Sequence, residues 1–134
     1  MTAVVEYLKA NPVQYFATVG LDGKAKNRPF QFMTEYNGKL WFCTGTHKEV
    51  YKELKANPSF ELSVTAPDFS WLRISGDAEF SDDRSIKQMC IDCSPLVAQI
   101  YKTADNPILA VFCVANGEAE IADFSGDPPQ TYKL

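Results

Sequence analysis

Two glycine-containing dipeptides in the first third of the chain constrain its fold more than any other feature. Asp22-Gly23 and Asn37-Gly38 each separate two segments of strand-like composition, and two-residue hairpin turns favour these dipeptides. The flanking segments Val13–Val19, Lys24–Tyr36 and Lys39–Cys43 are therefore predicted to form an antiparallel meander. This order of signals indicates a mainly β chain built from hairpins.

The rest of the chain continues the pattern, with helices between strands. Further strands are expected over residues 59–65, 71–80, 108–114 and 118–122, the last two joined by an Asn116-Gly117 turn. Helices are expected over residues 2–11, 47–56, 82–93 and 94–103, and the tail from Asp123 to Leu134 is expected to be coil. Closing the strands into a barrel removes the exposed edges of an open sheet. We therefore predict one domain over residues 1–134, a β-barrel of six or seven antiparallel strands with flanking α-helices.

Charge and composition exclude several classes of function. The net charge of the 134 residues is −4, so the basic surface needed for nucleic acid or for an anionic membrane is missing. No apolar segment approaches the roughly 18 residues needed to span a bilayer, and the N-terminus lacks the basic region of a signal peptide. We expect a cytoplasmic protein that acts on a small molecule and keeps its four cysteines as thiols.

Arg28 and Pro29 lie inside the second expected strand and mark the first half of a candidate site. Proline removes a backbone donor from a strand, so Pro29 is expected at an edge or a bulge. The backbone groups of Phe30 and Gln31 are then free to meet a ligand, such as the alternating donors and acceptors on the pyrimidine edge of a flavin. The alternative interpretation is an edge strand with an exposed arginine.

The start of the second expected helix supplies the other half of the site. Thr46 and Glu49 match the capping-box pattern, with Thr46 at the N-cap. The helix dipole disfavours a cation such as Lys48 in the first turn unless an anion binds there. Thr44 adds a hydroxyl donor, and Arg28 would complete a charged clamp on one phosphate. The alternative is an ordinary helix start with a solvated lysine.

As a set, the motifs of this chain resemble the FMN-binding split-barrel family, the pyridoxamine 5′-phosphate oxidase-like proteins, in their short single-domain bacterial form. The resemblance covers essentially the whole chain and rests on residues 13–19, 28–32, 42–46, 48–54, 71–76 and 123–129. It implies a split barrel that forms a homodimer and holds FMN at the subunit interface.

The resemblance also implies a set of cofactor-binding residues. These residues are Arg28, Pro29, Phe30, Gln31, Cys43, Thr44, Gly45, Thr46, Lys48, Trp71, Arg73 and Asn106. The segment from Arg28 to Gln31 would line the isoalloxazine ring, and Thr44, Thr46 and Lys48 would hold the ribityl phosphate. Trp71 stands where the oxidase pattern has a glutamine that touches the flavin. Arg73, or a backbone donor of Phe30 or Gln31, would stabilise the anionic reduced flavin, and Asn106 would reach the flavin of the partner subunit.

The implied function is that of an FMN-dependent oxidoreductase, which passes electrons or hydride from a reduced nicotinamide to a small acceptor. The residues that bind the substrate phosphate in the true oxidases are missing, so a substrate other than pyridoxamine phosphate is expected. No residue stands out as a catalytic acid or base. Two alternatives stay open: a non-catalytic FMN-binding or electron-transfer module, and a cofactor-free dimeric barrel.

Two other features are interpreted as structural. Cys90 and Cys93 form a C-x-x-C pair, but they fall at the end of an expected helix, whereas reactive pairs lie at helix N-termini. His47 is the single histidine, so the chain lacks the ligands of a zinc site and no metal is expected. At a helix start, His47 is expected to face solvent or a phosphate rather than to act in catalysis.

Overall fold

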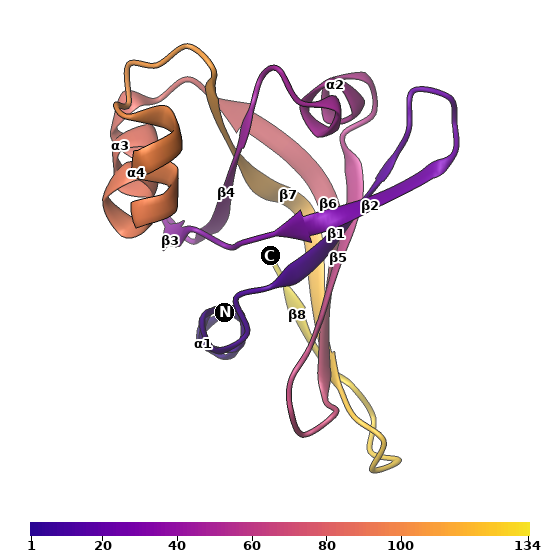
Figure 1. Ribbon diagram of the computed structural model, residues 1–134. Helices are drawn as coiled ribbons and strands as arrows, with labels where there is room; N and C mark the ends of the chain where they lie inside the picture. Colours follow the sequence, from indigo (N-terminus) through magenta and orange to yellow (C-terminus); the bar gives the residue numbers. More distant parts are fainter.

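The computed structural model describes residues 1–134 and consists of one curled antiparallel sheet with four helices around it (Figure 1). The strands are β1 (Gln14–Val19), β2 (Ala25–Phe30), β3 (Thr34–Tyr36), β4 (Lys39–Gly45), β5 (Ser59–Thr65), β6 (Trp71–Ser81), β7 (Leu109–Ala122) and β8 (Gln130–Lys133). The helices are α1 (Thr2–Ala10), α2 (Glu49–Ala56), α3 (Arg84–Cys93) and α4 (Pro95–Tyr101).

The order of the strands makes the barrel a split one. The sheet runs β2-β1-β5-β6-β7-β4-β3, and β8 pairs with β7 beside this path. The two end strands, β2 and β3, do not pair with each other. The mainly β, antiparallel barrel predicted from the sequence is thus confirmed, with eight strands rather than six or seven.

Aromatic rings fill the inside of the curled sheet. Phe16, Phe42 and Phe112 are completely buried, and the rings of Phe16 and Phe42 each lie 5.7 Å from that of Phe112. Strand β5 alternates buried and exposed residues along its whole length, as expected where one face of a sheet packs on the core. Helix α1 contributes Val4 and Leu8 to the same core.

Both predicted hairpin turns in the first third of the chain are confirmed. Asn37 and Gly38 have φ angles of 53° and 71°, the left-handed pair that a type I′ turn requires. The carboxylate of Asp22 accepts a hydrogen bond from the amide of Lys24 across the first turn, at 3.0 Å. These turns fix the register of β1 with β2 and of β3 with β4.

The strand expected from Lys24 to Tyr36 is divided in the structure, because residues 31–33 leave the sheet between β2 and β3. The side chain of Gln14 is completely buried and takes the place of a strand partner. Its carbonyl oxygen accepts a hydrogen bond from the amide of Phe32 at 2.7 Å, and its nitrogen donates to two carbonyls at the end of α1. The break leaves an opening beside β4.

The prediction of a turn at Asn116-Gly117 is wrong. Both residues lie within the single strand β7, where a Cβ atom at Gly117 would come within 2.5 Å of Val114. The register of β6 against β7 shifts between Ser75 and Asp77 at the same place, so the dipeptide forms a β-bulge that bends a long strand. The tail predicted as coil also forms a strand in part, because β8 pairs with β7.

Helices α3 and α4 begin at the caps that the sequence predicted. The carboxylate of Asp83 accepts from the amide of Ser85 at 2.9 Å, and the hydroxyl of Ser94 accepts from the amide of Val97 at 3.3 Å. The two helices pack together on one side of the sheet (Figure 1). No helix in the structure combines the length and the apolar character needed to cross a bilayer.

Candidate functional site

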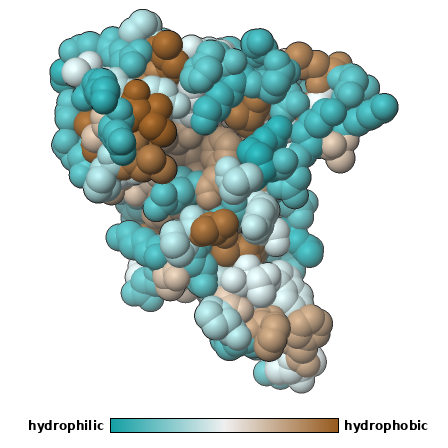
Figure 2. Space-filling view, viewed as in Figure 1, coloured by the Kyte–Doolittle hydropathy of each residue, from teal (hydrophilic) through white to brown (hydrophobic).

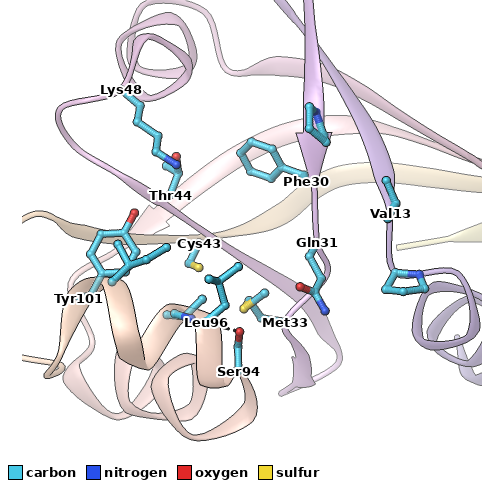
Figure 3. Close-up of a pocket in the computed structure, with 14 residues that line it drawn as sticks. Val13, Phe30, Gln31, Met33, Cys43, Thr44, Lys48, Ser94, Leu96 and Tyr101 are labelled. Atoms are coloured by element: carbon cyan, nitrogen blue, oxygen red, sulfur yellow. Dashed lines mark hydrogen bonds between the residues drawn. The ribbon is translucent and has the colours of Figure 1, made fainter.

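A cleft opens where the barrel is split, between the residues that follow β2, the end of β4 and helix α4 (Figure 3). It is lined by Pro12, Val13, Pro29, Phe30, Gln31, Met33, Cys43, Thr44, Lys48, Ser94, Leu96, Val97, Ile100 and Tyr101. Its volume of about 310 Å³ lies at the lower end of the range for small-molecule pockets. Figure 2 shows apolar side chains gathered beside α4 at the edge of a hollow. One rim of the cleft is therefore apolar.

The end of β2 forms one wall of the cleft. Strand β2 is an edge strand of the sheet, as predicted for a strand that contains Pro29. The ring of Phe30 stacks on Phe16 with 4.5 Å between centroids, which anchors this wall to the core. Gln31 is exposed, and its backbone makes no hydrogen bond to another backbone group. The wall therefore offers free backbone donors and acceptors to a ligand.

The hydroxyl of Thr44 is the clearest sign of a binding site in this cleft. Thr44 lies near the end of β4 and is only 3% exposed, yet its Oγ1 atom has no hydrogen-bond partner. A buried polar group without a partner costs about 1–3 kcal/mol, and most such groups in native proteins are satisfied. Because Thr44 lines the cleft, a ligand with an acceptor atom would satisfy it.

Lys48 brings the only full positive charge to the cleft lining. Its side chain is exposed and forms no ion pair, and its amide donates to the carbonyl of Gly45 at 3.0 Å. The predicted capping box is wrong: α2 begins at Glu49, Lys48 itself is the N-cap, and no side chain caps the helix. The unpaired ammonium and the uncapped helix start both favour an anion here.

The guanidinium of Arg28 does not join Lys48 in the cleft. Its Nη2 atom pairs with the buried carboxylate of Glu53 at 2.6 Å, and its Nη1 atom donates to the hydroxyl of Thr18 and to the carbonyl of Phe16. A buried carboxylate needs a partner charge, and Arg28 supplies it. The two-cation clamp predicted from the sequence is therefore reduced to Lys48.

Three other predicted site residues also lie away from the cleft lining. Trp71 lies at the start of β6 and packs against Phe124, with 5.1 Å between ring centroids. Arg73 is exposed and pairs with Glu61 at 3.1 Å on the outer face of the sheet. Asn106 follows α4, and its side-chain nitrogen donates to the carbonyl of Tyr101 at 2.9 Å.

The remaining predicted residues lie in or beside the cleft. Cys43 lines it directly, whereas Gly45 and Thr46 continue the chain from Thr44 toward α2. The amide of Thr46 donates to the carbonyl of Ile108 at 2.8 Å, so this segment is held against the start of β7. The sequence thus located the β2 and β4 walls of the site.

The thiols near the cleft are protonated at neutral pH. Burial raises the pKa of Cys43 to about 12, with a further increase from Cys93 and an opposing effect of Lys48. Burial also raises the pKa values of Cys90 and Cys93. A protonated thiol is a poor nucleophile and a poor metal ligand, so these cysteines act as structural side chains.

The third wall of the cleft is formed by α4 and was not predicted from the sequence. Leu96 and Ile100 are 59% and 55% exposed at the rim, while Tyr101 is buried and reaches inward. The signal in the sequence was the pair of apolar residues Leu96 and Ile100, four positions apart on an expected helix. Their position opposite β4 depends on the packing of α3 and α4, which local patterns do not encode.

The curled sheet, split between β2 and β3, defines a split-barrel protein, and the split opens onto a cleft with one cation in its lining. The sequence matches the family model described as pyridoxamine 5′-phosphate oxidase over residues 1–125. The chain therefore belongs to the pyridoxamine 5′-phosphate oxidase family, which confirms the resemblance inferred from the motifs. None of the curated proteins matches the chain.

Solved structures agree with this assignment. A NimC/NimA family protein from Clostridium acetobutylicum is 30% identical, with a TM-score of 0.92 over 100% of this chain and 92% of that chain. A C. acetobutylicum protein related to general stress protein 26, of the pyridoxinephosphate oxidase family, is 20% identical (TM-score 0.75, 99% and 93% covered). A pyridoxamine 5′-phosphate oxidase-related, FMN-binding protein from Nostoc punctiforme is 16% identical (TM-score 0.70, 97% and 87% covered). The last two likenesses support the fold alone.

The residues of the cleft fit a flavin phosphate. Thr44 offers an unsatisfied buried hydroxyl and Lys48 an unpaired ammonium, which are donors that a phosphate accepts. The free backbone groups at Gln31 suit the polar edge of a planar ring. The apolar side chains beside them suit the ring faces.

Proposed function

We propose that this chain binds FMN in the cleft between β2, β4 and α4. The observation that carries the proposal is the buried, unpartnered hydroxyl of Thr44 in a cleft whose one cation is Lys48. The family assignment supports it, as does the structural neighbour described as FMN-binding. In this proposal Thr44 and Lys48 hold the phosphate, while the backbone at Pro29, Phe30 and Gln31 orients the ring.

We further propose an oxidoreductase that takes electrons or hydride from a reduced nicotinamide and passes them to a small acceptor. When bound, FMN would supply hydride and single-electron transfer. The cleft lining contains no Asp, Glu or His, and the pKa values of Cys43 and Tyr101 are raised. The lining residues therefore offer no carboxylate or imidazole for proton transfer near pH 7, and in this proposal they bind and orient the flavin.

We also propose that the chain forms a homodimer through the outer face of β1. Val13, directly before β1, and Tyr15 and Val19 on the outer face of β1 are 59%, 53% and 39% exposed, although Phe16 on the other face is buried. A strand that is apolar on both faces is typical of a sheet covered on both sides, and a second copy would cover this one. Arg73 lies in the same row as Tyr15 across β5, so it would meet the partner subunit rather than its own cleft.

The visible spectrum of the purified protein tests flavin binding. Flavin absorbance that is released on denaturation, or quenching of FMN fluorescence on titration of the colourless protein, is the expected result. A colourless protein that leaves FMN fluorescence unchanged would contradict the proposal and would favour a cofactor-free barrel.

Anaerobic mixing of the FMN-loaded protein with reduced nicotinamide separates the enzyme from an electron-transfer module. Rapid bleaching followed by turnover with an added acceptor supports an oxidoreductase. Bound FMN that is bleached by a chemical reductant but not by reduced nicotinamide supports the non-catalytic alternative.

Analytical ultracentrifugation of Tyr15→Glu beside the unmodified protein tests the dimer, since a charge at Tyr15 is expected to yield monomers.

A further inference from the structure

Tyr101 at the end of α4 reaches the same part of the cleft as Thr44 and Lys48. Its side chain is 4% exposed, and its ring packs in a small cluster with Val97 and Leu109. A Cβ atom added to Gly45 would lie 3.0 Å from the hydroxyl of Tyr101 and 2.7 Å from Nδ1 of His47, so both side chains lie against the end of β4. In Figure 3 the hydroxyl is turned toward the strand that carries Thr44, and Lys48 extends toward that strand from the start of α2.

Three polar groups on three different elements are thus left without partners around one end of the cleft. The hydroxyl of Thr44 is buried without a hydrogen-bond partner, and the one side-chain hydrogen bond at Tyr101 is made by its backbone carbonyl, not by its hydroxyl. Lys48 forms no ion pair. All three groups are donors, and the cleft lining holds no carboxylate that would accept from them. A ligand group rich in acceptors, such as a phosphate, can accept a hydrogen bond from each of the three donors.

We propose that Tyr101 is a specificity-determining residue whose hydroxyl donates to the phosphate of FMN, so that the site selects FMN over the unphosphorylated riboflavin. This inference rests on the proposed FMN site and adds a role for α4, which the motifs on β2 and β4 did not include. Helix α4 then acts as the third wall of an anion subsite.

Two features of the chain hold Tyr101 ready for this role. The side-chain nitrogen of Asn106 donates to its carbonyl at 2.9 Å, and Lys102 ends the helix directly after it with a φ of 73°. Burial raises the pKa of the Tyr101 hydroxyl, and the nearby Cys43 adds to the shift. The group therefore stays protonated, and remains a donor, throughout the physiological pH range.

If Tyr101 only filled space, Tyr101→Phe would leave the affinities for both flavins unchanged. The ring fills space between Val97 and Leu109, and Phe would fill the same space. The hydroxyl stabilises nothing within the chain, since it has no partner there. Tyr101→Phe therefore removes the donor and leaves the packing, and the folded protein is expected to keep its stability.

The test compares two flavins on the Tyr101→Phe protein by fluorescence titration. The affinity for FMN is expected to fall roughly tenfold, as for one lost hydrogen bond to a charged group, while the affinity for riboflavin stays the same. Tyr36→Phe is the control, because Tyr36 is a partly buried tyrosine that packs on the core and lies outside the cleft. Both affinities of this control are expected to equal those of the unmodified protein.

The outcomes separate this inference from the proposed function. If the unmodified protein binds neither flavin, the FMN site and the role of Tyr101 both fall. If it binds FMN and Tyr101→Phe keeps the same preference for FMN over riboflavin, the role of Tyr101 is overturned and the FMN site stands. An equal loss of affinity for both flavins also overturns it, because the hydroxyl would then act on a part that the two flavins share and not on the phosphate.

Discussion

The guanidinium group of Arg28 lies 2.6 Å from the carboxylate of Glu53, whose side chain in α2 is almost completely buried. The hydroxyl of Thr18 joins them: it donates to Glu53 at 2.8 Å and accepts from Arg28 at 2.7 Å. This network ties β1, β2 and α2 together. Because Pro29 follows Arg28 directly and Lys48 is the N-cap of α2, the network also fixes the spacing between two walls of the cleft.

Replacement of Arg28 by methionine is expected to lower the free energy of unfolding by about 3 kcal/mol, because the charge of Glu53 is then buried without a partner. Denaturant titration of the flavin-free protein measures the loss. Arg84→Met is the matched control, since Arg84 also pairs with a carboxylate, that of Asp105 at 2.7 Å, but both side chains are exposed. That exposed pair is expected to contribute far less. Equal small losses in the two variants would show that the buried pair does not stabilise the fold.

Replacement of Lys48 by alanine is expected to weaken FMN binding at least roughly tenfold, because a charge-assisted contact to the phosphate is lost. The stability of the flavin-free protein should not change, since Lys48 is exposed and unpaired. Lys52→Ala serves as the control on the same helix, where Lys52 pairs with Glu49 at 3.4 Å in solvent. If FMN binds equally to both variants, Lys48 does not contact the phosphate.

Thr44→Val should affect stability and binding in opposite directions. Valine has the shape of threonine without the unpartnered hydroxyl, so the flavin-free protein is expected to gain about 1 kcal/mol of stability while its affinity for FMN falls. Thr18→Val provides the comparison, because the hydroxyl of Thr18 makes two hydrogen bonds and its loss should destabilise the fold. A destabilised Thr44→Val protein would mean that the hydroxyl of Thr44 already has a partner.

The sequence predicted those elements that local signals specify. The left-handed turn at Asn37 and Gly38 and the caps at Asp83 and Ser94 depend on neighbours within a few residues, so a single pattern defines each of them. The same holds for β5, whose alternation reflects its one buried face. The β2 and β4 walls of the site were located in this way.

The structure differs from the sequence-based predictions where contacts between distant residues decide the conformation. The break before β3 depends on the side chain of Gln14 reaching the amide of Phe32, and nothing near Phe32 in sequence indicates it. The Asn116-Gly117 dipeptide became a bulge because β6 pairs with β7 on both sides of it. Arg28 was assigned to a phosphate because Glu53, its partner 25 residues away, gives no sign in the sequence that it is buried.

The partly buried thiol of Cys43 makes stability depend on alkaline pH. Its pKa is about 12 in the folded protein, against 9.0 for an unperturbed thiol. Below pH 9.0 both states hold the proton and the stability is unaffected. Above pH 9.0 the unfolded chain loses a proton that the folded chain keeps. Each further pH unit up to about 12 therefore lowers the free energy of unfolding by at most roughly 1.4 kcal/mol, the value of one pKa unit. Urea titrations at neutral pH and at about pH 10 measure this loss.

Cys43→Ala isolates the contribution of this thiol, because the other thiols, tyrosines and lysines of the chain titrate in both proteins. The variant is expected to be less stable at neutral pH, since it loses packing against α4, but to lose less of its stability between neutral pH and about pH 10. Reaction of the folded protein with iodoacetamide gives a second measure: a protonated, partly buried Cys43 should react more slowly than the same residue in urea. An unchanged pH dependence in Cys43→Ala would mean that the thiol ionises near its ordinary pKa. Fast alkylation of Cys43 in the folded state would mean that solvent reaches this wall of the cleft.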